Sequence, residues 1–223
     1  MKEKDDLIRS LLIPFLLVFI MWLIHIIHWY FDVDFHYLGI YPRHINGLQG
    51  VLTTIFVHSG FEHLLNNSIP LLLLGTALFL YYPEFAFRLL IYLSILTGIY
   101  VWILGRESWH IGASGLVYAL ASFHILSAIL RKEMKLLSFS MLVVFLYGGM
   151  VWGFFPEFFP KKNISFESHI MGSITGLLFA WKFRKIGLQR EEYPWDEDDD
   201  EDVPEEERYW EVRNDELDKH NDS

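Results

Sequence analysis

Three short stretches of the sequence carry side chains that peptide-bond chemistry requires. They are HSGFEHLLNN, with His63 and Asn67; GASG, with Ser114; and HIMGSITG, which starts at His169. A serine hydroxyl is a poor nucleophile until a base takes its proton, and a histidine ring can take it and later return it to the leaving amine. Ser114 and His169 are therefore the candidate nucleophile and base of an acyl-transfer reaction.

The oxyanion that forms in such a reaction needs N–H donors. His63 and Asn67 are four residues apart and share one face of a helix, so their side chains can donate together. The backbone N–H of Ser114 is a further candidate, because the first turn of a helix leaves its N–H groups without helical partners.

Residue spacing also indicates which side chains can support the ring of His169. Tyr118 follows Ser114 by four residues, so its ring lies on the same helix face and can pack against the imidazole. Glu167 stands two residues before His169 and would point to another side of the helix. No other acid is in an obvious orienting position, so a Ser–His dyad is a simpler hypothesis than a triad.

Each of these residues has an ordinary structural interpretation when it is taken alone. A serine in an apolar helix usually bonds to a backbone carbonyl, and a histidine near the end of a span is often interfacial. The prediction depends on their joint occurrence. The ten histidines also suggest a metal site, but His58 and His63 are five residues apart and no acid completes an HExxH pattern. We therefore expect neither a metal nor a cofactor.

Long apolar runs must position these residues. About 20 apolar residues cross a bilayer, and the sequence offers six candidate spans, at about residues 11–30, 64–82, 86–104, 111–130, 136–154 and 169–184. Pro, Gly or charge clusters separate them. A soluble helical bundle is the alternative, but little of residues 11–186 would be left to face water. The sequence thus predicts an all-α membrane protein with a six-span core at residues 11–186, after a short cytoplasmic segment at residues 1–10.

Basic residues near the spans predict the orientation. With the N-terminus in the cytoplasm, the inner side holds Lys2, Lys4, Arg9, Arg88, Arg131, Lys132, Lys135, Lys182, Arg184, Lys185 and Arg190, and the outer side holds Arg43, Arg106, Lys161 and Lys162. Six spans then leave both termini in the cytoplasm. The second, fourth and sixth spans run inward, so the polar residues at their N-terminal ends should meet near the outer face. His63, Asn67 and His110 could line a route for water to Ser114.

Small residues predict close packing of the fourth and sixth spans. Gly115 with Ala119, and Gly172 with Gly176, form two pairs spaced four apart, which let helix backbones approach closely in lipid. Such an approach would bring the Ser114 hydroxyl within hydrogen-bond reach of the His169 ring.

Composition separates the end of the chain from the rest. Residues 191–223 hold 17 of the 28 acids and 3 of the 18 bases, which gives −14 there and leaves +4 (15 bases minus 11 acids) for residues 1–190. We expect residues 187–223 to be a disordered acidic cytoplasmic tail, or else a segment that binds a protein partner through Trp195, Tyr209 and Trp210.

The absence of cysteine excludes disulfides and a thiol nucleophile. Aromatic residues in the segment 31–62 suggest an outer loop at the membrane interface.

Together, HSGFEHLLNN, GASG and HIMGSITG resemble the signature of the rhomboid family of intramembrane serine proteases, over residues 11–186. The resemblance implies that Ser114 is the nucleophile and His169 the base. It also implies supporting roles at the oxyanion or beside the histidine for His58, His63, Asn67, Gly112 and Tyr118. Asn66 adjoins Asn67, and the spacing from His63 favours Asn67.

The resemblance further implies substrates that are single-pass membrane proteins, cut near the outer end of their transmembrane helix, and a bacterial inner membrane suits the compact core. The sequence departs from many bacterial members, which carry a Trp-Arg pair where Gln49 and Gly50 stand, and Ser168 replaces a smaller residue. Two alternatives stay open: a catalytically inactive rhomboid-like protein that binds or escorts membrane clients, and a small transporter. We predict no nucleic-acid partner and leave the oligomeric state open.

Overall fold

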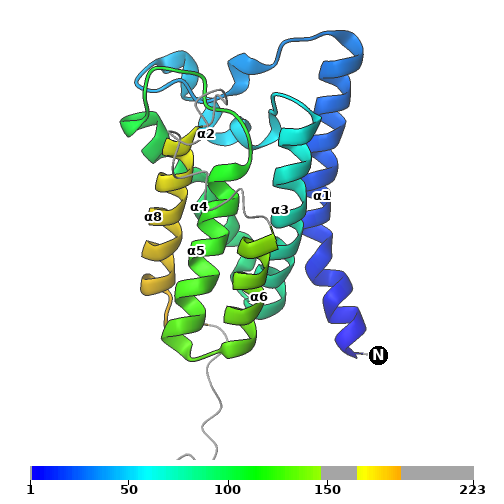
Figure 1. Ribbon diagram of the computed structural model, residues 1–223, viewed down its shortest axis with the longest axis vertical. Coiled ribbons are helices and arrows are strands. Elements are labelled where there is room, and N and C mark those ends of the chain that lie inside the picture. The colour runs from blue at the N-terminus through cyan, green and yellow to red at the C-terminus, as the bar shows by residue number, and fades with distance from the viewer. Residues whose placement is uncertain (1, 147–164, 187–223) are drawn as a thin grey trace, which may run out of the picture. The chain divides into compact units, whose positions relative to one another are not determined.

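The computed structural model describes residues 2–146 and 165–186, and most of these residues are helical. The α-helices are α1 (Lys2–Phe31), α2 (Gly50–Thr53), α3 (Phe61–Tyr81), α4 (Ala86–Leu104), α5 (Ser114–Arg131), α6 (Met134–Leu146) and α8 (Phe166–Lys182) (Figure 1). Three short 3-10 helices, η1 (His36–Leu38), η2 (Ile45–Gly47) and η3 (Thr54–Phe56), lie between α1 and α3. Within the described ranges there is no strand, only one isolated backbone bridge between Ile40 and His110.

Among the described residues, four helices are long and apolar enough to cross a membrane: Asp5–Phe31 of α1, and the whole of α3, α4 and α5. They match the first four predicted spans, although α3 begins at Phe61, three residues before the predicted start. The fifth predicted span is described only as far as Leu146, and residues 147–154 lie outside the described residues. The sixth predicted span corresponds to α8, which has 17 residues. The acidic tail also lies outside the described part of the chain.

The ends of the helices follow from local sequence. Lys132 has a φ of 56° and, in this left-handed conformation, its N–H caps the carbonyls of Ala128 and Ile129 at the end of α5. Gly105 ends α4, where its N–H bonds to the Val101 carbonyl. A left-handed lysine and an extended glycine therefore terminate two helices whose interiors are apolar.

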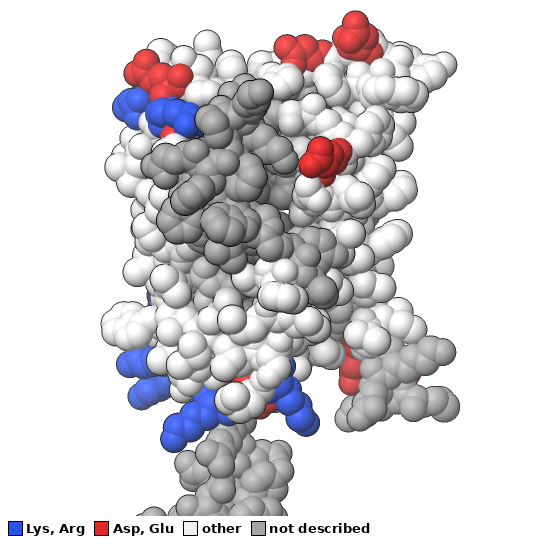
Figure 2. Space-filling view, in the orientation of Figure 1, with Lys and Arg blue, Asp and Glu red and all other residues white. Residues whose placement is uncertain are grey.

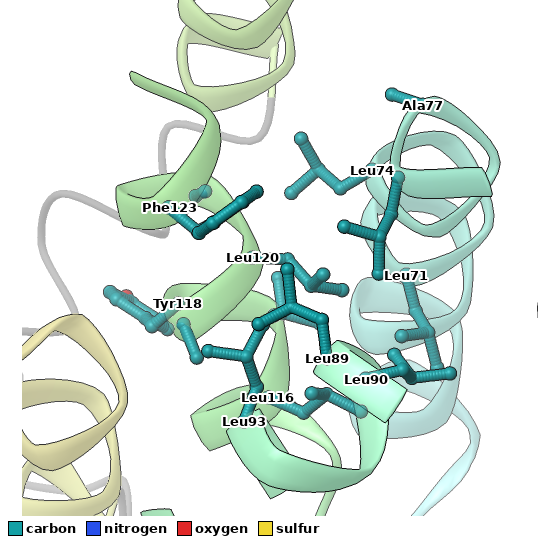
Figure 3. Close-up of a cluster of buried hydrophobic side chains, with 14 of the residues drawn as sticks. Leu71, Leu74, Ala77, Leu89, Leu90, Leu93, Leu116, Tyr118, Leu120 and Phe123 are labelled. Carbon is teal, nitrogen blue, oxygen red and sulfur yellow. The ribbon is translucent and has the colours of Figure 1, made fainter. Parts of the chain in front are cut away.

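The described core lies where α3, α4 and α5 face one another. Leucines of α3 and α4 point towards α5, as Figure 3 shows for Leu71, Leu74, Leu89 and Leu93. These four side chains are at most 1% exposed. Outward-facing side chains are apolar too: Phe15, Phe19 and Phe87 are each more than half exposed. A helix that is apolar on both its inward and its outward side is suited to a lipid environment, because contact between its outward side and water would cost a large amount of free energy.

Helices α3, α5 and α8 all begin at the end of the bundle opposite the N-terminus of α1 (Figure 1). This arrangement agrees with the depth expected from the sequence for the polar residues at their starts. On the face shown in Figure 2, most of the described Lys and Arg side chains gather at the other end, where α5 and α8 finish.

Helices α5 and α8 share the largest interface between two described helices. A Cβ atom at Gly172 would collide with the carbonyl oxygen of Gly115, and one at Gly176 would lie 2.9 Å from the backbone N of Phe123 and collide with the carbonyl oxygen of Ala119. The predicted small-residue pairs are therefore in direct contact. Only glycine at positions 172 and 176 permits this separation of the two backbones.

Candidate active site

The start of α5 and the first turn of α8 bring a hydroxyl and an imidazole together. Ser114 opens α5, and its Oγ lies 3.0 Å from Nε2 of His169, an ordinary hydrogen-bond distance. His169 is 7% exposed, whereas Ser114 is partly exposed. The close approach of the two helices at Gly115 and Gly172 sets this distance, as the sequence predicts.

Tyr118 lies one turn below Ser114 and stacks on the histidine. The Tyr118 and His169 rings are nearly parallel, at 8°, with centroids 4.1 Å apart. Offset stacking of this kind holds an imidazole in one orientation without a carboxylate. Glu167, as expected, faces elsewhere: its carboxylate lies 3.4 Å from Nε of Arg106.

His63 and Asn67 project from α3 towards the loop just before Ser114. A Cβ built on Gly112 would lie 2.8 Å from Nε2 of His63 and 3.5 Å from Nδ2 of Asn67. Gly112 has a φ of 108°, so glycine is required both for this backbone conformation and for the space. The predicted donors and the start of α5 are therefore in one cluster.

Both side chains have an N–H that can serve a bound oxyanion. The Ser59 hydroxyl lies 3.1 Å from Nδ1 of His63; when it donates there, the neutral ring carries its proton on Nε2, the nitrogen next to Gly112. Nδ2 of Asn67 is buried and has no hydrogen-bond partner among the described residues. Asn67 is 4% exposed while Asn66 faces outward, in agreement with the choice made from spacing.

His58 has a role that the sequence left uncertain. Its Nε2 accepts a hydrogen bond from the N–H of Ala113, the residue before Ser114, at 3.4 Å. His58 is 2% exposed, and burial, followed by the nearby His63 and His25, lowers its pKa to about 3. The ring is therefore neutral at physiological pH and remains an acceptor, which holds the backbone immediately before Ser114.

The segment between α1 and α3 fixes the loop that leads into α5. The N–H of Gly112 donates to the carbonyl of Thr54 at 3.0 Å, and the Thr54 hydroxyl donates to the carbonyl of His110 at 2.8 Å. Ile40 and His110 exchange two backbone hydrogen bonds, at 2.8 and 2.9 Å. Neither Thr54 nor Ile40 is predicted from the sequence, because a backbone pairing between distant loops leaves no signal in residue type and a threonine in a loop does not reveal the partner of its hydroxyl.

The structure corrects the role expected for His110. We expected this ring to line a route for water, but it is 1% exposed. Its Nδ1 lies 2.5 Å from the Ser165 hydroxyl and its Nε2 3.0 Å from the Arg106 carbonyl, and burial lowers its pKa. Ser165 in turn contacts the Ser168 hydroxyl at 2.6 Å. His110 thus ties the loop before α5 to the start of α8.

The departure from the Trp-Arg pattern also has a structural explanation. A Cβ at Gly50 would collide with the backbone of Gly39 and Ile40, so the start of α2 lies directly against this part of the segment between α1 and α3. The Gln49 side chain donates to the Tyr37 carbonyl at 2.8 Å. Backbone contact and an amide side chain therefore hold this part of the loop together.

The metal hypothesis gains no support from the geometry. Among the described residues, no three His, Asp or Glu side chains are placed to hold one ion. The cluster around Ser114 contains a hydroxyl, an imidazole and N–H donors, which are the groups that acyl transfer requires.

Comparison with known proteins identifies the family. The pattern of the Rhomboid domain matches residues 46–186, which include the three stretches with Asn67, Ser114 and His169. The chain belongs to the rhomboid family. As a rhomboid with several long apolar helices, it is an integral membrane protein.

Similar proteins include an uncharacterized protein and proteins whose names contain the word rhomboid. An uncharacterized protein of Mycobacterium tuberculosis is 30% identical over 150 residues, which is 64% of this chain and 62% of that protein. "Rhomboid-related protein 1" of Caenorhabditis elegans is 31% identical over 133 residues, 57% of this chain and 37% of that protein. "Putative rhomboid protease YdcA" of Bacillus subtilis is 28% identical over 134 residues, 59% of this chain and 65% of that protein. The chain spans less than two thirds of each of these relatives.

Proposed function

We propose that this rhomboid is an intramembrane serine endopeptidase that uses Ser114 as nucleophile and His169 as general base. The observation that carries the proposal is the 3.0 Å separation of Ser114 Oγ and His169 Nε2, beside the side-chain donors of His63 and Asn67. The Bacillus subtilis relative, whose name includes the word protease, supports the same activity.

In the proposed reaction His169 takes the proton of Ser114 as Oγ attacks the scissile carbonyl carbon. The carbonyl oxygen becomes an oxyanion, which can accept hydrogen bonds from His63, Asn67 and the backbone N–H of Ser114. The C–N bond then breaks, and His169 gives its proton to the leaving amine. Water repeats the sequence on the acyl-enzyme, again with His169 as base, and releases the acid.

We propose single-pass transmembrane segments as substrates. A stable helix keeps its carbonyls in internal hydrogen bonds, so the substrate must unwind locally before Ser114 can attack. Ser114 lies at the start of α5, at the end of the bundle opposite most of the described basic residues of the face shown in Figure 2. Basic residues favour the cytoplasmic side, so cleavage would occur near the outer face, with the N-terminus in the cytoplasm. A bacterial inner membrane is the proposed location.

Cleavage of a model single-pass substrate in liposomes tests the proposal. We expect Ser114→Ala and His169→Ala each to lower the cleavage rate roughly a thousandfold or more, because nucleophile and base act as one unit. Ser122→Ala is a matched control: it removes a hydroxyl of the same helix that donates to the Tyr118 carbonyl, at 2.8 Å, and not to His169. Equal cleavage by wild type and both variants would remove the assignment. No cleavage by the wild type of any of a panel of single-pass helices would favour the alternative, an inactive rhomboid that binds membrane clients.

A further inference from the structure

A groove separate from the active site lies between α4 and α8, at the end where these two helices carry their basic residues. Its volume is about 540 Å³, within the range of small-molecule sites. It is lined by Glu84, Phe85, Arg88, Leu89, Tyr92, Phe179, Lys182, Phe183 and Ile186. Most of these side chains are apolar or aromatic, and the charged ones are Arg88, Lys182 and Glu84.

Aromatic rings form one wall of this groove. Tyr92 stacks on Phe179 at 6.0 Å and 15°, and Phe179 stacks on Phe183 at 5.6 Å and 21°. Phe85 contacts Phe183 with centroids 5.5 Å apart. Tyr92 is 47% exposed, so the wall is open to the lipid that surrounds a membrane protein. Such a wall suits an acyl chain better than it suits water.

The cations of the groove lack counter-ions in the described part of the chain. Nζ of Lys182 lies over the Phe179 and Phe183 rings, at 5.9 and 5.7 Å from their centroids. Neither Lys182 nor Arg88 is within 4.0 Å of a carboxylate of the described residues. Two cations that no described carboxylate neutralises, beside an apolar wall, are complementary to a ligand with an anionic head and an apolar body.

We propose that this groove binds an anionic glycerophospholipid. Arg88 and Lys182 contact the phosphate, and one acyl chain lies along Tyr92, Phe179 and Phe183. Glu84, which repels a bare anion, can accept a hydrogen bond from a headgroup hydroxyl, so a glycerol headgroup fits better than a plain phosphate ester. Basic pockets between transmembrane helices are sites where membranes supply such lipids.

Lipid binding to the full-length protein in a neutral detergent tests this. Native mass spectrometry would compare phosphatidylglycerol with phosphatidylcholine of the same acyl chains. Each cation near a lipid surface contributes about a fivefold gain in binding, so Arg88→Gln with Lys182→Gln should weaken phosphatidylglycerol binding roughly 30-fold. Lys132→Gln with Lys135→Gln removes the same charge outside the groove and should leave binding unchanged. Excess glycerol phosphate should not displace the lipid, because the acyl chain also contributes; displacement would contradict an acyl-chain contact.

A photoreactive phosphatidylglycerol gives a second measurement, which needs no variant. With the reactive group in the acyl chain, we expect adducts on peptides that contain Tyr92, Phe179 or Phe183. Adducts spread evenly over the outer helices, or equal binding of the two lipids, would overturn the proposal. Carbodiimide cross-links between Lys182 and carboxylates of residues 191–223, in a wild type that shows no lipid preference, would also overturn the proposal. They would mean that the acidic tail, and not a lipid, occupies the groove.

Discussion

Two neighbouring asparagines on α3 have different environments, because consecutive residues of a helix face different directions. Asn67 is 4% exposed and its Nδ2 lies beside Gly112, whereas Asn66 faces away from the bundle. The two side chains are chemically identical, so any difference between their variants reports position alone. The pair therefore tests whether an amide beside Gly112 serves the reaction.

We predict that Asn67→Ala lowers kcat by about 10²–10³-fold, the usual effect of removing one oxyanion donor. Asn66→Ala should leave kcat within about twofold, since its amide lies outside the cluster. The rate of cleavage of one model substrate under saturating conditions measures both. Similar losses in the two variants would mean that Asn67 acts through helix stability and not through the oxyanion.

His58 makes stability depend on pH. Its pKa is about 3 in the folded protein and about 6.5 in an unfolded chain. Between these values the unfolded state binds the extra proton, so falling pH destabilises the fold and the effect is absent above about pH 6.5. At pH 5 the loss is about 2 kcal/mol, because each pH unit below 6.5 costs about 1.4 kcal/mol.

We therefore predict that the melting temperature of the wild type falls between pH 7.5 and pH 5, and that it falls less in His58→Gln. Some decline should persist in the variant, because burial also lowers the pKa of His110. Thermal unfolding in detergent at several pH values provides the measurement. Parallel profiles for wild type and variant would contradict a buried neutral imidazole at position 58.

At the scale of helices, the contact of α5 with α8 is the critical interface. The Ser114–His169 separation depends on the backbones meeting at Gly115 and Gly172, where any side chain at Gly172 would collide with a carbonyl oxygen. Overpacking such a contact costs about 1–3 kcal/mol and shifts the helices. The same shift would lengthen the distance from the hydroxyl to the imidazole.

We predict that Gly172→Ala lowers both the melting temperature and the cleavage rate, the rate by about 10²-fold, as displacements near 1 Å often do. Gly60→Ala is the matched control, because nothing lies within 4 Å of a Cβ built there and its φ of 175° suits any residue. Thermal unfolding and the cleavage assay check both variants. A fully active and stable Gly172→Ala would show that the contact can relax without cost.

Much of this element structure follows from the sequence. Apolar runs place four spans within a few residues, and spacings of four place Tyr118, Asn67 and the glycine pairs on the correct faces. The support of the loop before α5 by Thr54 and Ile40 does not follow, because backbone hydrogen bonds between distant loops are independent of side-chain type and the sequence does not reveal which carbonyl the Thr54 hydroxyl meets. The burial of His110 was missed because a histidine in a loop can equally face water or a neighbouring hydroxyl.

On the scale of the whole molecule, the distribution of charge predicts the orientation in the membrane. In the view of Figure 2 the described Lys and Arg side chains are mostly at the end opposite the start of α5. Cytoplasmic loops retain such residues. The proposed active site would then open towards the outer face, and the chain's lack of cysteine makes this simple to test.

We predict that a membrane-impermeant maleimide labels Ile45→Cys in intact cells and labels Lys132→Cys only after the membrane is permeabilised. Ile45 is 83% exposed in the segment between α1 and α3, and Lys132 is exposed between α5 and α6. The cysteine-free parent gives the background. The reverse labelling pattern would invert the orientation and place cleavage at the cytoplasmic face.

The central claim is that His169 activates Ser114, and covalent labelling tests it most directly. A fluorophosphonate reacts with an activated serine by attack of Oγ on phosphorus with loss of fluoride, and mass spectrometry of the digested protein locates the adduct. We predict one adduct, on Ser114, in the wild type and almost none in His169→Ala, because the hydroxyl then lacks its base. An adduct that forms equally well in His169→Ala, or that lies on another serine while Ser114 stays unmodified, would contradict the account.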